Sequence, residues 1–317
     1  MPELPTCLIT GGTGFVGGAM MRAMGKSSSA LARGAVRRST GREAGMVEVG
    51  EINAETDWGL AHKNVKWVVH TAARVHVAPS ESPESLASFR RTNVQGTLRL
   101  ARQAAMGGVS RFVFLSTVKV HGEATAQGSP FHEDSQTTPH DAYAMSKVEA
   151  EHCLREIASE TGMEVVIIRP PLVYGPGVKA NFAALMGLVA KGIPLPFGAL
   201  DNRRSMVALD NLVDMIITCL THPAAADQSF LVSDGHDLST TELVQRIAQS
   251  MNRPTQLISV PAGILMACAA ALGRKPAAER LCGNLQVDIT KARKRLGWSP
   301  PVSVDEGLRR AVSGILR

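Results

Sequence analysis

Three glycines near the start of the chain restrict its fold more than any other feature. Gly11, Gly14 and Gly17 follow the short apolar run Cys7-Leu8-Ile9-Thr10, and an apolar helical pattern begins at Phe15. This order predicts a buried parallel strand, a tight turn and a helix. The first glycine permits the turn, the second lets the backbone approach a pyrophosphate, and the third lets helix and strand pack closely. The helix N-terminus would offer free N–H groups to that anion. A glycine-rich turn without a ligand is the alternative.

A second pair of residues gives this loop a chemical context. Tyr143 stands four residues before Lys147, and helical spacing places both side chains on one face. A phenol has a pKa of about 10, which is too high for proton transfer near neutral pH. A neighbouring ammonium stabilises the phenolate and lowers that pKa. Such a pair alone is often only a surface contact, but together with the glycine loop it predicts an oxidoreductase that binds a nucleotide cofactor.

Composition excludes several other classes. The chain has 317 residues, of which 44% are hydrophobic and 20% charged, as expected of a globular protein. The net charge of +6 comes from scattered Lys and Arg without a basic run, so nucleic acid is not an expected partner. The five cysteines have no metal-ligand spacing, which indicates reduced, buried thiols and no metal site.

Membrane insertion is not expected either. No signal peptide is visible, because the first predicted strand and the glycine loop begin at once, and we expect a cytoplasmic location. The most apolar stretch, Ile264 to Leu272, is too short to span a bilayer. We expect a buried helix there, with an interfacial membrane contact as the alternative.

Strands and helices alternate through the first half of the chain. Strands are predicted at residues 6–10, 34–38, 46–49, 66–70, 111–116 and 164–169, and helices near 15–25, 84–106 and 141–161. This alternation predicts the α/β class, with a Rossmann-type doubly wound parallel sheet and right-handed crossovers. Further helices are predicted at 240–251 and 304–316.

The expected organisation has two lobes. Residues 1–173 form an NAD(P)-binding Rossmann domain, to which residues 205–220 return. Residues 174–202 hold many Gly and Pro, which suggests loops that line a ligand cleft. Together with residues 221–317 they form a smaller α/β lobe for the substrate.

Six motifs together resemble those of the extended short-chain dehydrogenase/reductases, specifically the nucleotide-sugar epimerase/dehydratase branch. They are the glycine loop, His70-Thr-Ala-Ala73, Asn93-Val-Gln-Gly-Thr97, Leu115-Ser-Thr-Val-Lys-Val-His-Gly122, the Tyr143/Lys147 pair and Arg169-Pro-Pro-Leu-Val-Tyr-Gly-Pro176. The resemblance covers nearly the whole chain. The C-terminal pattern of Arg280-Leu281, Asp288 and Leu296-Gly-Trp298 looks most like bacterial surface-polysaccharide enzymes. Those act on UDP-N-acetyl-hexosamine derivatives as 4-epimerases or 4-keto reductases.

The resemblance implies roles for individual residues. Tyr143 is the acid–base residue, Lys147 holds the nicotinamide ribose, and Thr117 hydrogen-bonds the reacting oxygen. Without the resemblance, Thr117 is a strand-end hydroxyl, and Asn93 is as likely structural as ligand-binding. Cofactor contacts are implied for Gly11, Thr13, Gly14, Phe15, Val16, Gly17, Arg37, Arg38, Glu51, Ile52, Thr71, Ala72, Ala73, Asn93, Tyr143, Lys147 and Pro170. Substrate contacts are implied for Arg74, Lys119, Asn181, Arg203, Arg204 and Arg280.

Two departures from the family pattern narrow the function. The family's 4,6-dehydratases follow the catalytic Thr with Asp-Glu, whereas Val118 and Lys119 stand here, so dehydratase chemistry is not expected. The second strand ends in Arg37-Arg38, where an NAD enzyme usually places an acid. Guanidinium groups suit the 2′-phosphate of NADP instead, with two solvated arginines as the alternative. Glu51 replaces the family's Asp beside the adenine, which leaves that contact open.

These residues predict an NAD(P)-dependent enzyme that acts at C4 of a UDP-activated hexosamine. The paired arginines favour a 4-keto reductase that uses NADP(H), with NAD(H) possible, because NADPH is the usual cellular reductant. One alternative is a UDP-hexose or UDP-N-acetylhexosamine 4-epimerase. Two others are a reductase of a ketone or aldehyde without a nucleotide, and a non-catalytic NADP-binding regulator. The resemblance also implies a homodimer.

Overall fold

The computed structural model describes residues 4–26, 30–39, 45–75 and 83–314, which build a parallel sheet of seven strands. The strands are β1 (Thr6–Thr10), β2 (Leu31–Val36), β3 (Met46–Glu48), β4 (Val65–His70), β5 (Arg111–Leu115), β6 (Glu164–Arg169) and β9 (Ser229–Leu231). They lie in the order β3-β2-β1-β4-β5-β6-β9. The order reverses between β1 and β4, so a ligand crevice is expected at the carboxyl ends of these two strands.

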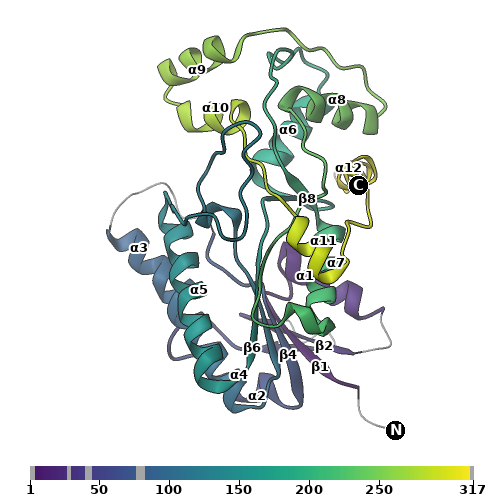
Figure 1. Ribbon diagram of the computed structural model, residues 1–317. Coiled ribbons are helices and arrows are strands. Elements are labelled where there is room, and N and C mark those ends of the chain that lie inside the picture. Colours follow the sequence, from purple (N-terminus) through teal and green to yellow (C-terminus); the bar gives the residue numbers. More distant parts are fainter. Residues whose placement is uncertain (1–3, 27–29, 40–44, 76–82, 315–317) are drawn as a thin grey trace.

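Helices cover both faces of the sheet (Figure 1). They are α1 (Phe15–Met24), α2 (Gly59–His62), α3 (Pro83–Phe89), α4 (Thr97–Met106), α5 (Ala142–Thr161), α7 (Leu209–Thr221) and α11 (Thr290–Leu296). Helices α1, α7 and α11 pack on the face that carries Ile9, whereas α4 and α5 pack on the face that carries Leu8. Neighbouring strand residues point to opposite faces, and here both are buried. The predicted α/β class with a doubly wound parallel sheet is confirmed.

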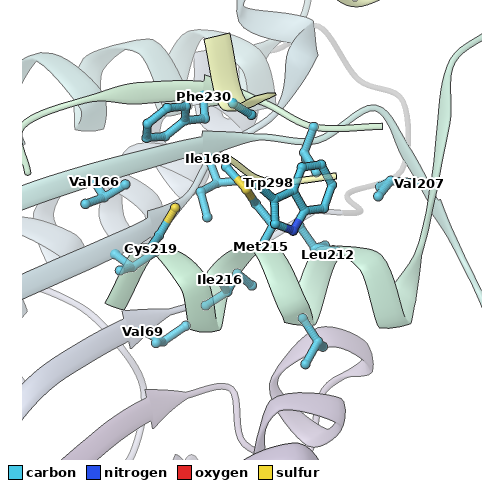
Figure 2. Packing of buried hydrophobic residues seen from close by; sticks show 14 of the residues in the cluster. Val69, Val166, Ile168, Val207, Leu212, Met215, Ile216, Cys219, Phe230 and Trp298 are labelled. Carbon is cyan, nitrogen blue, oxygen red and sulfur yellow. The ribbon is translucent and has the colours of Figure 1, made fainter. Parts of the chain in front are cut away.

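Figure 2 shows the packing of α7 on the first of these faces. Leu212, Met215 and Ile216 of α7 lie among the apolar side chains of the strands, including Val69 and Ile168. All five side chains are fully buried. This contact joins the returning segment of the chain to the main sheet.

Two predicted elements have different boundaries. The predicted strand 34–38 runs from Leu31 to Val36, so Arg37 and Arg38 follow β2 rather than lie in it. The predicted helix 84–106 is divided into α3, the π-helix η1 (Arg90–Gly96) and α4. A π-helical turn widens the helix locally, and such turns frequently occur at functional sites.

The second lobe lies above the carboxyl ends of the main strands (Figure 1). It contains α6 (Ala180–Ala190), α8 (Thr240–Ser250), α9 (Ala262–Ala271), α10 (Lys275–Cys282), α12 (Val304–Ser313) and the parallel pair β7 (Leu172–Tyr174) and β8 (Met206–Ala208). The predicted lobe boundaries differ from this arrangement, because β7 and β8 come largely from residues assigned to the first lobe (1–173 and 205–220), and part of 221–317 lies with the main sheet. Strand β9 pairs with β6, and α11 packs against β9, so both belong to the main sheet and its covering layer.

The expectation of a buried helix at Ile264 to Leu272 is wrong. Helix α9 occupies this stretch, yet none of its residues is buried. Cys268 on this helix is likewise exposed, whereas Cys7 and Cys219 are buried. Among the described residues, no helix combines the length and apolar character needed to cross a membrane.

Candidate active site and cofactor groove

The glycine loop connects β1 to α1 at the point where the strand order reverses. Gly11 has a φ of +67°, a conformation that glycine adopts at no steric cost. Its carbonyl accepts the N–H of Gly14 at 2.7 Å, and a Cβ on Gly17 would overlap the same carbonyl oxygen. The first turn of α1 holds no acidic side chain, and its N-cap residue makes no side-chain cap bond. The free N–H groups at this helix start therefore fit the pyrophosphate of a dinucleotide.

The end of β4 forms the neighbouring wall of this crevice. Thr71 donates its hydroxyl to the Thr10 carbonyl at 2.6 Å, and Ala72 donates its N–H to the Thr10 hydroxyl at 3.1 Å. Thr71, Ala72 and Ala73 are all partly exposed. Their partial exposure is compatible with the predicted cofactor contacts, which stay a prediction.

Asn93 of η1 has its side chain engaged within the protein. Its Oδ1 accepts the Arg74 N–H at 2.8 Å, and its Nδ2 donates to the Arg74 carbonyl and to the Ser146 hydroxyl, both at 3.0 Å. Ser146 in turn donates to the carbonyl of Tyr143 at 2.7 Å. Of the two roles open at the sequence level, this geometry favours the structural one, because Asn93 ties the loop after β4 to α5.

The arginines after β2 differ in their surroundings. Arg37 and Arg38 are both exposed, and the Arg37 guanidinium lies 3.9 Å from the Glu51 carboxylate. Ile52 is partly exposed and packs against Gly96 of η1. Within the described part of the chain, Arg38 has no ion-pair partner. Arg38 is therefore the arginine that a 2′-phosphate could bind without competition from a carboxylate of the described residues.

Lys147 of α5 lies in the protein interior. Its side chain is buried, and its Nζ lies 4.0 Å from the ring centre of Phe114. The described residues place no ion pair or hydrogen bond on this nitrogen. Burial lowers the pKa of Lys147 to about 7, although the more distant Glu151 acts in the opposite direction.

Tyr143 is one helical turn before Lys147, and its ring packs at 6.2 Å from that of Phe89. Burial raises the pKa of Tyr143 well above its ordinary value, and the Asp141 carboxylate raises it further. The sequence predicted a lowered pKa through the neighbouring ammonium. In the free protein desolvation outweighs that effect, so the phenol keeps its proton.

Thr117 lies where β5 ends and the short helix η2 (Val118–Val120) begins. Its hydroxyl accepts the Lys119 N–H at 3.3 Å, and the N–H of Val118 donates to the carbonyl of buried Pro170 at 2.9 Å. The second bond fixes this turn against the end of β6. The Pro170 carbonyl is therefore committed to the protein backbone.

Lys119, expected to contact the substrate, is held by two carboxylates. Its Nζ donates to Glu123 at 2.7 Å and to Asp141 at 2.8 Å. Burial acts to lower the pKa of Lys119, but the bonds to both carboxylates outweigh it and raise the pKa overall. Asp141 also caps α5 by accepting the Ala144 N–H at 2.6 Å. Lys119 thus fixes the helix start that carries Tyr143.

The arginines of the second lobe are not equivalent. Arg203 forms ion pairs with Glu242 at 2.9 Å and with Asp201 at 3.2 Å. Arg204 makes a side-chain hydrogen bond to the Gly283 carbonyl at 3.1 Å but no ion pair among the described residues. Burial lowers the pKa of Arg204, and the nearby positive charge of Arg280 lowers it further. This pair of guanidinium groups offers positive charge to an anion.

Glu123 connects the two halves of the site. It accepts from Lys119 on the Tyr143 side, and its negative charge also acts on Arg204. Asn181, another expected substrate contact, is exposed near the start of α6, on the second lobe.

Sequence comparison decides the family. The model of the NAD dependent epimerase/dehydratase family matches residues 7–233. The chain belongs to this family. A UDP-glucose 4-epimerase of Vibrio cholerae is 47% identical over 319 residues, which cover 100% of this chain and 97% of the relative. An N-acetyl-alpha-D-glucosaminyl-diphospho-ditrans,octacis-undecaprenol 4-epimerase of Escherichia coli O157:H7 is 31% identical over 248 residues, which cover 73% of this chain and 72% of the relative.

A solved structure shares the fold over its whole length. The UDP-glucuronic acid 4-epimerase of Bacillus cereus, in complex with NAD, matches with a TM-score of 0.79 at 20% identity and covers 98% of each chain. The predicted family and enzyme class are confirmed. The preference for a 4-keto reductase is not supported, because both sequence relatives named above are 4-epimerases.

Several residues that shape the site were missed at the sequence level. Asp141, Glu123 and Ser146 position the segments that carry Tyr143 and Thr117, as described above. Asp141 had a readable signal, since an Asp directly before a helix is a preferred N-cap. Buried His70 lies 2.7 Å from the Thr10 hydroxyl through Nδ1 and 2.9 Å from the Thr97 hydroxyl through Nε2, and burial lowers its pKa to about 3. It is therefore a neutral anchor between β1, β4 and α4.

Proposed function

We propose that this protein is a UDP-hexose 4-epimerase that acts on UDP-glucose or UDP-N-acetylglucosamine and their C4 epimers. The observation that carries the proposal is that Thr117 at the end of β5 and Tyr143 in the first turn of α5 lie on segments joined by the Lys119–Asp141 ion pair, at the end of the sheet where the glycine loop also lies. The full-length similarity to the Vibrio cholerae relative supports epimerisation over net reduction.

The proton steps belong to Tyr143. When bound, a nicotinamide cofactor supplies the acceptance and return of a hydride at C4 of the sugar. In its phenolate form, reached when the phenol has given its proton to solvent, Tyr143 takes the proton of the C4 hydroxyl and later returns it, while the Thr117 hydroxyl hydrogen-bonds the same oxygen. The protonated form of Lys147 lowers the free energy of the phenolate, because opposite charges favour each other at short range in a buried site.

The second lobe holds the part of the substrate that does not react. A bidentate guanidinium fits a diphosphate well, and Arg204 with Arg280 supplies two such groups. Because this grip acts on the nucleotide and not on the sugar, the oxidised sugar ring is free to turn and present its other face. An epimerase needs this freedom, whereas a one-way reductase does not.

The test is conversion of UDP-glucose and UDP-N-acetylglucosamine by purified protein without added reductant. We expect each UDP-sugar of a C4 pair to be converted into its C4 epimer. Formation of no C4 epimer, together with NADPH consumption on a 4-keto-6-deoxy UDP-sugar, would instead establish the reductase.

A matched pair of variants tests the substrate grip. Arg204→Ala should raise KM about tenfold or more, since a hydrogen bond to a charged group contributes roughly 1.5–3 kcal/mol. Arg203→Ala should change KM much less, because its guanidinium already binds Glu242. Equal increases of KM in the two variants would contradict a role for Arg204 in binding the diphosphate.

A second candidate substrate is the same hexose joined to a polyprenyl diphosphate. The Escherichia coli relative is named for such a compound, and the diphosphate is common to both substrates. The exposed apolar helix α9, which packs on the helix that carries Arg280, favours this candidate. Comparison of kcat/KM for the two donors decides between them.

A further inference from the structure

Helix α9 presents an apolar stripe on its outer face. Ile264, Ala267, Cys268, Ala271 and the C-cap residue Leu272 are all exposed, at spacings of three, four, seven and eight residues from Ile264. Ile264 is 55% exposed and Leu272 is 76% exposed. A surface helix normally turns polar residues outward at these spacings. The outer face of α9 therefore lacks the side chains that water favours.

The position of α9 separates it from the apolar cores. It packs mainly against α10, and Figure 1 shows both helices at the outer end of the second lobe, away from the main sheet. No charged residue occurs between Arg253 and Arg274. Ile258 in the segment before α9 is also 54% exposed, which extends the apolar character of this end.

Basic residues follow directly where the apolar stretch ends. Between residues 262 and 283 the charged residues are Arg274, Lys275, Glu279 and Arg280, and all four are exposed. The Glu279 carboxylate lies 3.7 Å from Nζ of Lys275, so Arg274 and Arg280 have no acidic partner within this segment. An apolar helix face beside an excess of basic side chains is typical of binding to anionic lipid surfaces.

We propose that α9 docks the protein on the surface of an anionic lipid bilayer. Ile264 and Leu272 enter the boundary of the acyl chains, and Arg274, two residues after Leu272, contacts the headgroups. A helix of this length rises about 15 Å, half of the hydrocarbon thickness, so it lies in the interface and does not span it.

The basic residues also distinguish a bilayer from a second copy of the chain. Two copies joined through α9 by a twofold axis would present the same patch to each other. Arg274 would then add positive charge from both copies to one interface, whereas anionic headgroups neutralise it. The bilayer is therefore the occupant that satisfies both the apolar stripe and the charges beside it.

The test is co-sedimentation of the full chain with vesicles of phosphatidylcholine, with and without phosphatidylglycerol. We expect binding to the anionic vesicles, and weaker binding at high salt because the lipid charge is screened. Ile264→Asp and Leu272→Asp should each lower the vesicle affinity about tenfold or more, since each removes an aliphatic side chain from the acyl boundary. Leu60→Asp is the control, because Leu60 is 85% exposed on α2 of the other lobe, and it should bind as wild type.

Vesicle binding requires no turnover, so its failure is separate from failure of the proposed function. Unchanged melting temperature and UDP-sugar turnover would show that the α9 variants remain folded. Absence of wild-type binding to anionic vesicles, or wild-type affinity in both α9 variants, would overturn the proposal. A wild-type oligomer that Ile264→Asp dissociates would also overturn it, because a second copy would then cover this face.

Discussion

Replacement of Gly17 by Ala tests how closely α1 packs on the glycine loop. A Cβ at this position would overlap the Gly11 carbonyl oxygen and lie 2.7 Å from the Gly11 carbonyl carbon and 2.9 Å from Thr71 Oγ1. Two of these atoms belong to the backbone of a tight turn, so the helix itself must shift. Overpacking costs about 1–3 kcal/mol, and the better helix propensity of Ala returns about 1 kcal/mol. Because the backbone cannot move aside as a side chain can, the cost of overpacking should lie near the top of its range. We therefore expect Gly17→Ala to lower the unfolding free energy by about 2 kcal/mol.

Gly18, the next residue of the same helix, provides the matched control. A Cβ there would lie 3.4 Å from the Gly12 carbonyl oxygen and 3.5 Å from Arg22 Nη1, which are ordinary contact distances. Gly18→Ala should therefore stabilise the protein by roughly 0.5–1 kcal/mol, as expected in a helix interior. Two adjacent glycines should respond to the same substitution with opposite signs.

Urea denaturation of the cofactor-free protein measures both changes, as shifts of the midpoint at constant m-value. The affinity for NADH and NADPH should fall in Gly17→Ala and stay near wild type in Gly18→Ala. A midpoint for Gly17→Ala at or above that of wild type would contradict the packing of α1 against the Gly11 carbonyl.

Three further predictions concern Tyr143, Lys147 and the two arginines that follow β2. Tyr143→Phe should lower kcat about 10²–10⁴-fold and leave cofactor affinity largely intact, and a kcat above half of wild type would remove Tyr143 from proton transfer. The pKa of Lys147 is about 7 in the folded chain against 10.5 for the ordinary group, so the unfolded state binds more protons between these values. The unfolding free energy of wild type should thus rise by roughly 3 kcal/mol from pH 7 to pH 9.5. The urea midpoint of Lys147→Met should lack this rise. The same pH dependence of the midpoint in wild type and variant would contradict a buried lysine. Wild type should bind NADPH more tightly than NADH, and Arg38→Ala should weaken NADPH binding more than Arg37→Ala does; equal or tighter NADH binding in a fluorescence titration would contradict the preference.

The first lobe was predictable because local patterns determine it. The apolar run before Gly11 and the alternation of strands and helices suffice to predict a doubly wound sheet. Strand β9 was missed because Ser229-Phe230-Leu231 is a very short run, whose pairing with β6 depends on distant residues. The π-helix η1 was also missed, since no pattern in residues 84–106 distinguishes it from an α-helix.

Whether a candidate site residue is already paired within the protein depends on partners that are distant in the sequence. Arg203 and Arg204 are neighbours, yet only Arg203 meets Glu242, which lies 39 residues away in the sequence. The sequence likewise predicted Lys119 as a ligand contact, but the fold brings it to Asp141. An apolar run such as Ile264 to Leu272 is compatible with either a core or a surface helix, because the packing of the rest of the chain decides which is built, and here α9 packs mainly on α10.

The most direct measurement follows the hydrogen at C4 of the sugar. UDP-glucose that carries deuterium at C4 is incubated with purified protein in ordinary water without added reductant, and the product is examined by NMR and mass spectrometry. We expect UDP-galactose with deuterium still at C4, because an epimerase returns the same hydrogen to the opposite face of the ring. Absence of UDP-galactose, or a product that carries solvent hydrogen at C4, would contradict the proposed epimerisation.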